Sequence, residues 1–435
     1  NKVKLFDMNN NYLVNDKVFE KIELVSEPSQ SASGSFVYKM EGPSKYHYIM
    51  KVTINNNTHF HPARSEKYFY RIMTFLVNQY ITPHVFHLVS SCMDKEISKL
   101  KHSSNMSKDI QSFIDAKKKE ALELQAEGEK ISIPVYNYFS VLLTETSDSY
   151  VKLLTLHDMF KELEKAKIIP IIKFDIVINL LIQIIYTLHV FNLLKIRHND
   201  LHTVNIFVIK RRNNILNGNN KKFNRKYIFI GSDGKEKNII LPNIGLDVRI
   251  YDFDRSVKQE TPNFAFHKEA ICNNKMKKFI SVNQTCEENE SFDTYKILAY
   301  IFFYSVCRKN KDINDLLSSF FPSKELLQTG QIDGETLDYF DSETRYYLIS
   351  RPLKETEMLP TLTILERFNK HVKKNEYNVM EVYSTNYIEK PIIKKMNIRT
   401  SPKLPLSRSL TVKASTVRQN TTVRTEKVKR IINSS

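Results

Sequence analysis

The chain has 435 residues, of which 41% are hydrophobic and 26% are charged, and this composition is typical of a globular protein with one large domain or two ordinary ones. Its four cysteines are scattered without a Cys-x-x-Cys pair, which argues against a disulfide framework or a cysteine-based metal site and favours a reducing, cytosol-like compartment. The net charge is +17, but from Lys390 onward twelve Lys or Arg residues stand against one acid, so the charge alone is weak evidence for nucleic-acid binding.

The first part of the chain predicts strands with one helix. Alternating apolar and polar residues at 20–54 indicate strands, and residues 62–80 predict a helix whose apolar stripe contains Phe69, Ile72, Met73 and Leu76. A strand at 84–91 precedes a polar segment, 94–130, that we interpret as a surface helical insertion. A further strand is expected at 135–145.

The second part predicts mainly helices. Helices are expected at 153–164, at 174–194 and at 292–306, with more helical sequence up to about residue 375. Residues 174–194 belong to the longest apolar run, 168–194, but polar residues interrupt it, so we expect a buried amphipathic helix and no membrane anchor. Between these helices lie the strands 205–210 and 248–253, and residues 210–237 are expected to form an exposed hairpin loop.

These elements predict an α+β protein with two lobes. The expected organisation is an N-terminal extension (1–19), an N-lobe (20–147), a C-lobe (148–375) with a loop insertion at 210–245, and a basic, disordered tail (390–435).

The strongest local signal is the segment RHNDLHTVNIFV at 197–208, which lies between a predicted helix and a predicted strand. It places Asp200 and Asn205 on one loop. Phosphoryl transfer needs a carboxylate that orients the attacking hydroxyl group and an oxygen ligand for Mg²⁺ close by. A polar loop whose Asp and Asn form turns is the alternative. We expect His198 to brace this loop by packing and by a backbone hydrogen bond, and not to bind a metal.

Two further residues fit the same chemistry. Asp252 ends the strand at 248–253, where a carboxylate can bind a magnesium ion that bridges phosphates. Lys51 follows the apolar segment YIM, and a lysine is costly to bury unless it has an anionic partner. Glu66 in the next predicted helix is a suitable partner. An exposed strand end and a lysine that faces solvent are the alternatives.

In this order, the motifs resemble a divergent eukaryotic-type protein kinase over roughly residues 20–375. The form HNDLHxxN with DFDR is similar to serine/threonine kinases of large nucleocytoplasmic DNA viruses, of the iridovirus and giant-virus type, and the histidine after Asp-Leu is similar to haspin-type kinases. The resemblance implies a two-lobed kinase fold with an antiparallel-sheet N-lobe and a mainly helical C-lobe. It also implies ATP and Mg²⁺ as cofactors and transfer of the γ-phosphoryl group to Ser or Thr of protein substrates.

The resemblance implies roles for individual residues. Asp200 is expected to be the catalytic aspartate, with Asn205 and Asp252 as the magnesium ligands. Lys51, paired with Glu66, is expected to hold the α- and β-phosphates. The remaining expected residues are Gly34 of a reduced glycine-rich loop, Glu145 and Thr146 of the hinge segment 142–146 that would bind adenine through its backbone, and Asp293, which would hold the catalytic loop from below.

The sequence also departs from the kinase pattern. Gly34 stands alone in its loop, Asn199 replaces the usual arginine, Asp254 replaces a glycine, and no Ala-Pro-Glu motif closes the segment 256–291. Because Asn199 carries no charge, we expect no switch by an activation-loop phosphate. Two alternatives stay open. One is a pseudokinase that acts as a nucleotide-binding scaffold. The other is a small-molecule kinase of the choline or aminoglycoside type, because the segment HNDLxxxN also resembles the catalytic loop of those kinases.

The expected partners are protein substrates. Nucleic acid is a second option through the basic tail, but a solvated tail that is a target of autophosphorylation is favoured, and no membrane partner is expected. The viral resemblance implies the host cytoplasm, at the viral factory, as the location, with the virion as a second option.

Overall fold

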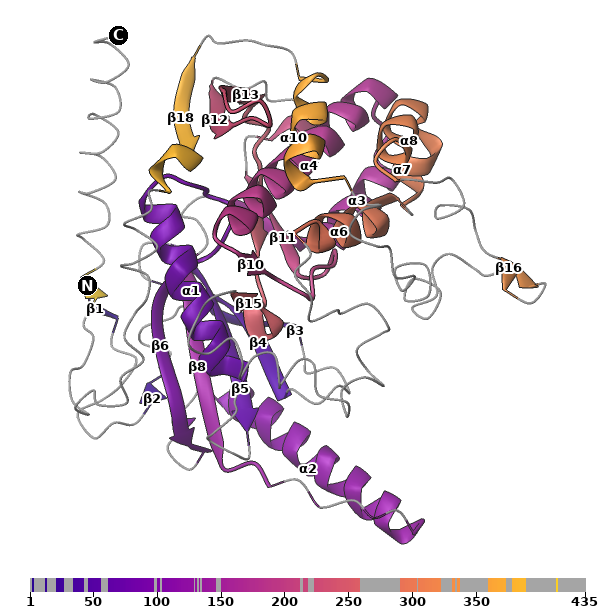
Figure 1. Cartoon of the computed structure of the whole chain (residues 1–435). Helices are drawn as coiled ribbons and strands as arrows, with labels where there is room; N and C mark the ends of the chain where they lie inside the picture. Colours follow the sequence, from indigo (N-terminus) through magenta and orange to yellow (C-terminus); the bar gives the residue numbers. More distant parts are fainter. Residues whose placement is uncertain are drawn as a thin grey trace. The chain divides into compact units, whose positions relative to one another are not determined.

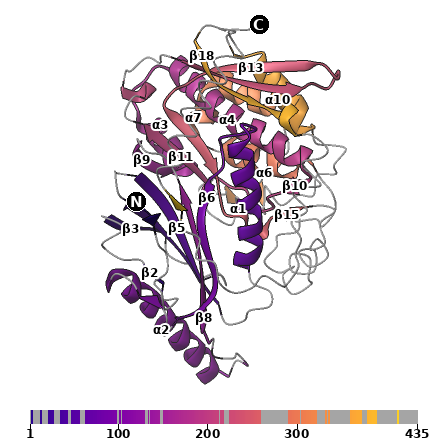
Figure 2. The same cartoon turned by 90° about the vertical axis from the view of Figure 1, so that its left-hand side faces the viewer.

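The computed structural model describes residues 2–3, 12–13, 21–26, 34–42, 46–55, 62–97, 100–101, 104–128, 130, 133, 135–145, 150–211, 214–217, 223–258, 290–302, 304–321, 331–332, 335–336, 359–372, 378–388 and 412–413. The chain divides into two compact units, shown with the whole chain in Figures 1 and 2. Unit 1 comprises residues 1–64, 88–148 and 400–435, and unit 2 comprises residues 65–87 and 149–399.

Unit 1 is built on a five-stranded sheet. Its strands, in spatial order, are β3 (Lys21–Ser26), β4 (Gly34–Gly42), β5 (Tyr46–Asn55), β8 (Tyr138–Glu145) and β6 (His87–Glu96). The pairs β3–β4, β4–β5 and β5–β8 are antiparallel. Short two-residue pairs join β1 (Lys2–Val3) to β19 (Val412–Lys413) and β2 (Tyr12–Leu13) to β7 (Leu100–Lys101).

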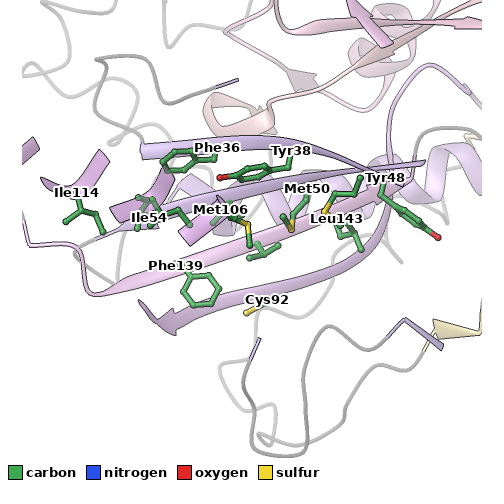
Figure 3. Packing of buried hydrophobic residues seen from close by; sticks show 14 residues of the cluster. Phe36, Tyr38, Tyr48, Met50, Ile54, Cys92, Met106, Ile114, Phe139 and Leu143 are labelled. Carbon is green, nitrogen blue, oxygen red and sulfur yellow. The ribbon is translucent and has the colours of Figure 1, made fainter. Parts of the chain in front are cut away.

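One face of this sheet forms a core with helix α2 (Ser104–Ala126). Met106, Ile110 and Ile114 recur every fourth residue, so they share one side of the helix, and all three are buried against the sheet. Figure 3 shows Met106 and Ile114 beside sheet side chains such as Phe36. The sheet contributes alternate residues of its central strands to this core: Phe36, Tyr38 and Met40 of β4, Tyr48, Met50, Val52 and Ile54 of β5, and Phe139, Val141 and Leu143 of β8.

The helical insertion predicted at 94–130 differs from the structure in two ways. Residues 94–96 belong to strand β6, which runs to Glu96 and most of whose residues are half-buried. The first half of α2 is part of the core, whereas most of 115–128 is exposed as expected. The charged composition of the segment did not predict this contact, because only Met106, Ile110 and Ile114 on one side of the helix pack against the sheet.

Unit 2 is built around helix α4 (Pro170–Leu193), predicted at 174–194. Every residue from 176 to 191 is buried, which confirms the prediction that this helix is buried. It has no exposed polar face over this stretch, so the prediction that it is amphipathic was wrong. The buried side chain of Gln183 is satisfied by backbone groups in place of water. Its Nε2 donates to the carbonyl of Leu246 at 3.0 Å, and its Oε1 accepts from the N–H of Val248 at 2.9 Å. These bonds fix α4 against strand β14 (Leu246–Ile250).

Helix α4 is also the single helix among the described residues that is long and apolar enough to cross a membrane by length and composition, with a mean hydropathy of 1.9. Of its most apolar stretch, 72% is buried inside the protein, as is usual for a core helix.

Two three-stranded sheets accompany α4. The first is antiparallel in the order β14, β11 (Ile206–Arg211) and β9 (Tyr150–Thr155). The second contains the hairpin of β12 (Asn224–Ile230) and β13 (Glu236–Pro242), with β18 (Val379–Ser384) parallel to β12.

The hairpin was expected to be an exposed loop, but its base is buried. Arg225 of β12 bonds Asp247 of β14 and, at 2.5 Å, Glu381 of β18. Arg211 bonds the other oxygen of Asp247 at 2.6 Å. Buried charges require such partners, so this ionic cluster ties the second sheet to the first.

The remaining helices agree with most of the sequence-based boundaries. Helix α1 (Pro62–Asn78) confirms the helix predicted at 62–80, and its apolar stripe is buried. The helix predicted at 153–164 begins later, as α3 (Leu156–Lys165), because residues 150–155 form β9. The helix predicted at 292–306 is split into α6 (Phe292–Phe302) and α7 (Ser305–Lys309). The other elements are β10 (Ile196–Arg197), β15 (Val257–Lys258), β16 (Gln331–Ile332), β17 (Glu335–Thr336), α8 (Lys311–Ser318), α10 (Thr361–Asn369) and the 3₁₀ turns η3 (Ile215–Asn217), η4 (Phe253–Arg255) and η8 (Thr385–Tyr387).

The sheet of unit 1 and the mainly helical unit 2 confirm the predicted α+β class. Of the predicted N-terminal extension (1–19) and basic tail (390–435), the structure describes only residues 2–3, 12–13 and 412–413. The prediction that the tail is disordered therefore lies outside the described residues.

Candidate functional site

The loop that carries Asp200, residues 198–205, is named here the Asp200 loop. It begins after β10, which pairs with β15, and it ends where β11 pairs with β14. Because Ile206 pairs with Ile250 and the N–H of Tyr251 donates to the carbonyl of Asn205 at 3.2 Å, Asn205 and Asp252 lie at the same edge of the sheet. The Nδ2 of Asn205 donates to the carbonyl of Asp200 at 2.9 Å. Unit 2 thus brings together the three polar residues that the sequence predicts for phosphoryl transfer.

Asp293, in the first turn of α6, anchors the Asp200 loop. Its Oδ2 accepts the N–H of His198 at 2.6 Å, and its Oδ1 accepts the N–H of Asn199 at 3.0 Å. Asp293 is buried, and hydrogen bonds to a buried carboxylate are stronger than those between neutral groups. The prediction that Asp293 holds the loop is confirmed by these bonds.

His198 braces the same loop from the side of Asp252. Its Nε2 lies 2.9 Å from the carbonyl oxygen of Tyr251, and its ring centroid lies 5.0 Å from that of Phe253. This confirms the expected packing and backbone contact. Phe253 is itself buried among further rings of unit 2, namely Phe69 and Tyr70 of α1 and Phe191 of α4.

Asp252 has a left-handed backbone conformation, with φ 69° and ψ 64°. Few residues other than glycine adopt this region, but Asp and Asn do so more readily than most. The N–H of Asp252 points to the hydroxyl group of Tyr70 at 3.4 Å. The conformation turns the chain sharply at the end of β14, between the Tyr251 carbonyl held by His198 and the buried ring of Phe253.

Asp200 lies between two cations. The Nζ of Lys296 is 3.6 Å from its Oδ1, and the Nη1 of Arg255 is 3.6 Å from its Oδ2. Burial by itself would raise the pKa of Asp200, but Lys296, Arg255 and, to a smaller extent, His202 and His198 outweigh it, so the pKa of Asp200 lies well below its usual range. Its side chain keeps 19% of its surface exposed. At neutral pH the site therefore presents an accessible, ionised carboxylate.

Sequence reasoning missed the roles of three residues around Asp200. Lys296 and Arg255 supply the positive charge just described. Asn199, noted only as a substitution for arginine, is buried with φ 66°, and its Nδ2 donates to the carbonyl of Arg255 at 2.9 Å. One signal was present in the sequence, since Lys296 interrupts an apolar helix three residues after Asp293 and thus shares its side of that helix.

The residues expected to bind the nucleotide from unit 1 have these places. Lys51 is buried in the central strand β5, on the sheet face opposite to the α2 core, and its cross-strand neighbours are Val37 and Leu142. Gly34 is the first residue of β4, and Glu145 is the last residue of β8, paired with Tyr48. Thr146 lies outside the described residues. Glu66, which belongs to unit 2, is buried in α1.

Asn205 and Asp252 have the chemistry of a magnesium site. Because the Nδ2 of Asn205 is bonded to the loop, its Oδ1 is the atom that can bind a cation. Within the described ranges, no group of three or more His, Cys, Asp or Glu side chains could hold a metal ion. Two protein oxygens suit a Mg²⁺ ion whose other ligands are water and phosphate oxygens, and they do not suit a metal caged by protein alone.

The arrangement in unit 2 follows the order that the sequence resemblance implied: a buried helix, an anchored loop with Asp200 and Asn205, and a strand that ends in Asp252. In chain order, an antiparallel sheet and α1 precede these elements, and the helices α6, α7, α8 and α10 follow them.

Comparisons with known proteins gave matches among solved structures alone. No family model matches the sequence, and no curated protein matches it. Among solved structures 283 chains match, and one of them is the crystal structure of the pseudokinase PEAK1 (Sugen kinase 269). The match has a TM-score of 0.32 and 10% sequence identity, and it covers 80% of this chain and 69% of that chain. A likeness at this level carries no argument about the activity, substrate or partners of this chain.

Proposed function

We propose that this chain is a protein kinase that uses ATP and Mg²⁺ and transfers the γ-phosphoryl group to Ser or Thr hydroxyl groups of protein substrates. The observation that best supports the proposal is the state of Asp200. It is ionised and partly exposed, and it lies with Asn205 on a loop that the buried Asp293 anchors. Asp252 lies at the same edge of the sheet as Asn205. A polar loop that only forms turns has no need of such an anchor.

Asp200 accepts a hydrogen bond from the incoming hydroxyl group and orients its oxygen toward the γ-phosphorus. Because its pKa lies well below the usual range, Asp200 is a weak base, and its main contribution is to position the hydroxyl group. Phosphoryl transfer passes through a loose transition state, so a weak base is sufficient. Asn205 and Asp252 would hold Mg²⁺, which would supply positive charge to neutralise the β- and γ-phosphates.

Lys51 is proposed to bind the phosphates, and Glu66, Gly34, Glu145 and Thr146 are proposed to complete the nucleotide site. Lys51 shares one sheet face with its apolar neighbours Val37 and Leu142. A lysine beside apolar side chains suits a nucleotide, whose base is apolar and whose phosphates are charged. The location in a virus-infected cell stays a prediction from the motif HNDLHxxN.

A pseudokinase is the second candidate, and one observation favours it. Both carboxylate oxygens of Asp200 have a cation at 3.6 Å, and an acceptor hydroxyl group must share these oxygens with Lys296 and Arg255. The separation exceeds that of a hydrogen bond, so lone pairs stay accessible, and this is why we favour the active enzyme.

The test is a labelled-ATP assay with protein and small-alcohol acceptors, with wild type, Asp200→Asn and the control Asp315→Asn. Asp315 is exposed on α8. We expect transfer to Ser and Thr by wild type and control, and a loss of about 10²–10⁴-fold in Asp200→Asn. Equal labelling by Asp200→Asn and wild type would remove the assignment. Magnesium-dependent thermal stabilisation by ATP without turnover would establish the pseudokinase, and transfer to small alcohols alone would establish the small-molecule kinase.

A further inference from the structure

Lys296 is a buried lysine in the apolar helix α6, and its contacts are directed at the Asp200 loop. Its Nζ donates to the carbonyl oxygen of Asn199 at 3.1 Å and lies 3.6 Å from Oδ1 of Asp200. It also lies 5.9 Å from the ring centroid of Phe292, close enough for a cation–π contact. Its side chain is only 11% exposed. A lysine in such a place loses most of its hydration, so its partners in the loop must compensate.

Asp293 and Lys296 together hold the backbone just before Asp200. The two residues are three apart, which places them on the same side of α6, one helical turn from each other. Asp293 accepts the N–H groups of His198 and Asn199, and Lys296 binds the carbonyl of Asn199. Donor and acceptor groups of Asn199 are therefore both fixed by one turn of one helix, which limits rotation of the peptide group that precedes Asp200.

The carboxylate of Asp200 faces charged groups from three elements. These are Lys296 of α6, Arg255 of η4, and His202 and His198 of the loop itself. Burial lowers the pKa of His202, and the negative charges of Asp200 and Asp252 act in the opposite direction. Arg255 is 37% exposed, so solvent screens its charge more than that of Lys296. Of the four groups, Lys296 lowers the pKa of Asp200 most.

We propose that Lys296 is the positioning residue of Asp200: it holds the loop through the carbonyl of Asn199 and fixes the orientation of the carboxylate through its contact with Oδ1. This inference rests on the proposed phosphoryl transfer. It assigns to a core helix a cation that no motif in the loop supplies, and it separates two tasks: the carbonyl contact fixes the loop, and the ammonium group orients the carboxylate.

The test compares Lys296→Met, Lys296→Gln and Lys296→Arg with Lys309→Met, a control at an exposed lysine of α7. Lys296→Met is expected to lower kcat by about 10²-fold, with little change in KM for ATP, because the misplaced carboxylate affects the chemical step. Lys296→Gln can keep the bond to the carbonyl of Asn199 but not the cation beside Oδ1 of Asp200, so it is expected to show a smaller fall in kcat. Lys296→Arg keeps the cation and should recover most of the wild-type kcat, and Lys309→Met should keep the wild-type kcat.

A second measurement decides the inference without activity. Aspartate labelled with ¹³C at the side-chain carboxyl group reports the surroundings of the carboxylate, and the Asp200 signal is identified by its absence in Asp200→Asn. At neutral pH we expect its chemical shift to move in Lys296→Met and Lys296→Gln and to stay near the wild-type value in Lys296→Arg and Lys309→Met. If wild type transfers no phosphate, the proposed function fails, while this signal still tests Lys296. An unchanged Asp200 signal in both neutral variants, or an unchanged kcat in Lys296→Met, would overturn the inference.

Discussion

Asp293 and Lys296 bind the same residue of the Asp200 loop from opposite sides: Oδ1 of Asp293 accepts the N–H of Asn199 at 3.0 Å, and Nζ of Lys296 donates to its carbonyl at 3.1 Å. Both side chains are buried, and both come from one turn of α6. The geometry of the loop therefore depends on α6, a helix that begins 92 residues after Asp200 in the chain (292 minus 200).

Replacement of Asp293 by Asn should destabilise unit 2 and loosen the Asp200 loop. The carboxylate binds two N–H groups, and an amide has only one oxygen to accept them, so one buried N–H group loses its partner. We expect the free energy of unfolding to fall by about 1.5–3 kcal/mol. Urea denaturation measures the loss, and Asp315→Asn on the exposed side of α8 serves as control. A variant as stable as wild type would show that the two bonds contribute nothing to the fold.

Asn199 should tolerate Gly better than Ala. Both substitutions remove the hydrogen bond that the side-chain amide of Asn199 donates to the carbonyl of Arg255. Only Ala brings a Cβ into the left-handed conformation at φ 66°. This conformation costs about 1–2 kcal/mol for a residue with a Cβ. Asn199→Ala is therefore expected to unfold at a lower urea concentration than Asn199→Gly. The reverse order would mean that the positive φ does not limit this position.

His189 should make unit 2 less stable in mild acid. Burial in α4 lowers the pKa of His189 from 6.5 to about 4, although Glu290 and Glu366 act in the opposite direction. The unfolded chain therefore binds more protons than the folded chain between pH 6.5 and 4, and the free energy of unfolding decreases as the pH falls through this range. The expected loss between pH 7.5 and 5 is about 2 kcal/mol.

The measurement for His189 is urea unfolding of wild type and His189→Leu at both pH values. His84 is also buried, and its pKa is likewise lowered, so it contributes a slope of the same sign to both proteins. The difference between the two slopes isolates His189. Equal pH dependence in the two proteins would contradict the prediction.

Lys51→Met should weaken nucleotide binding without unfolding unit 1. Methionine has nearly the same length as lysine and suits the apolar neighbours Val37 and Leu142. Loss of a charged contact to phosphate should weaken ATP binding by about tenfold or more. Calorimetric titration with MgATP measures this, and Lys108→Met on the exposed side of α2 is the control. Unchanged binding would exclude Lys51 from the nucleotide site.

Local sequence predicted the elements whose pattern repeats over several turns or alternates along a strand. The stripe of α1 and the strands of the unit 1 sheet follow from such patterns, and the loop with Asp200 and Asn205 follows from a short motif between a predicted helix and a predicted strand. Patterns failed where burial came from distant partners. The circumference of α4 is buried although Asn179, Gln183 and His189 are polar, because backbone groups of other elements satisfy Asn179 and Gln183. Arg225 is buried in a hairpin expected to be exposed, because Asp247 and Glu381 neutralise it.

The sequence by itself determined which residues carry the candidate chemistry, since Asp200, Asn205, Asp252 and Asp293 each stand at a recognisable point of an element. Only the tertiary structure decided the electrostatic state of Asp200. Charge acts through space over a few ångströms, and Lys296 and Arg255 come within 3.6 Å of the carboxylate from positions 96 and 55 residues further along the chain. No local pattern reports that proximity, because it exists only after α6 has packed beneath the loop.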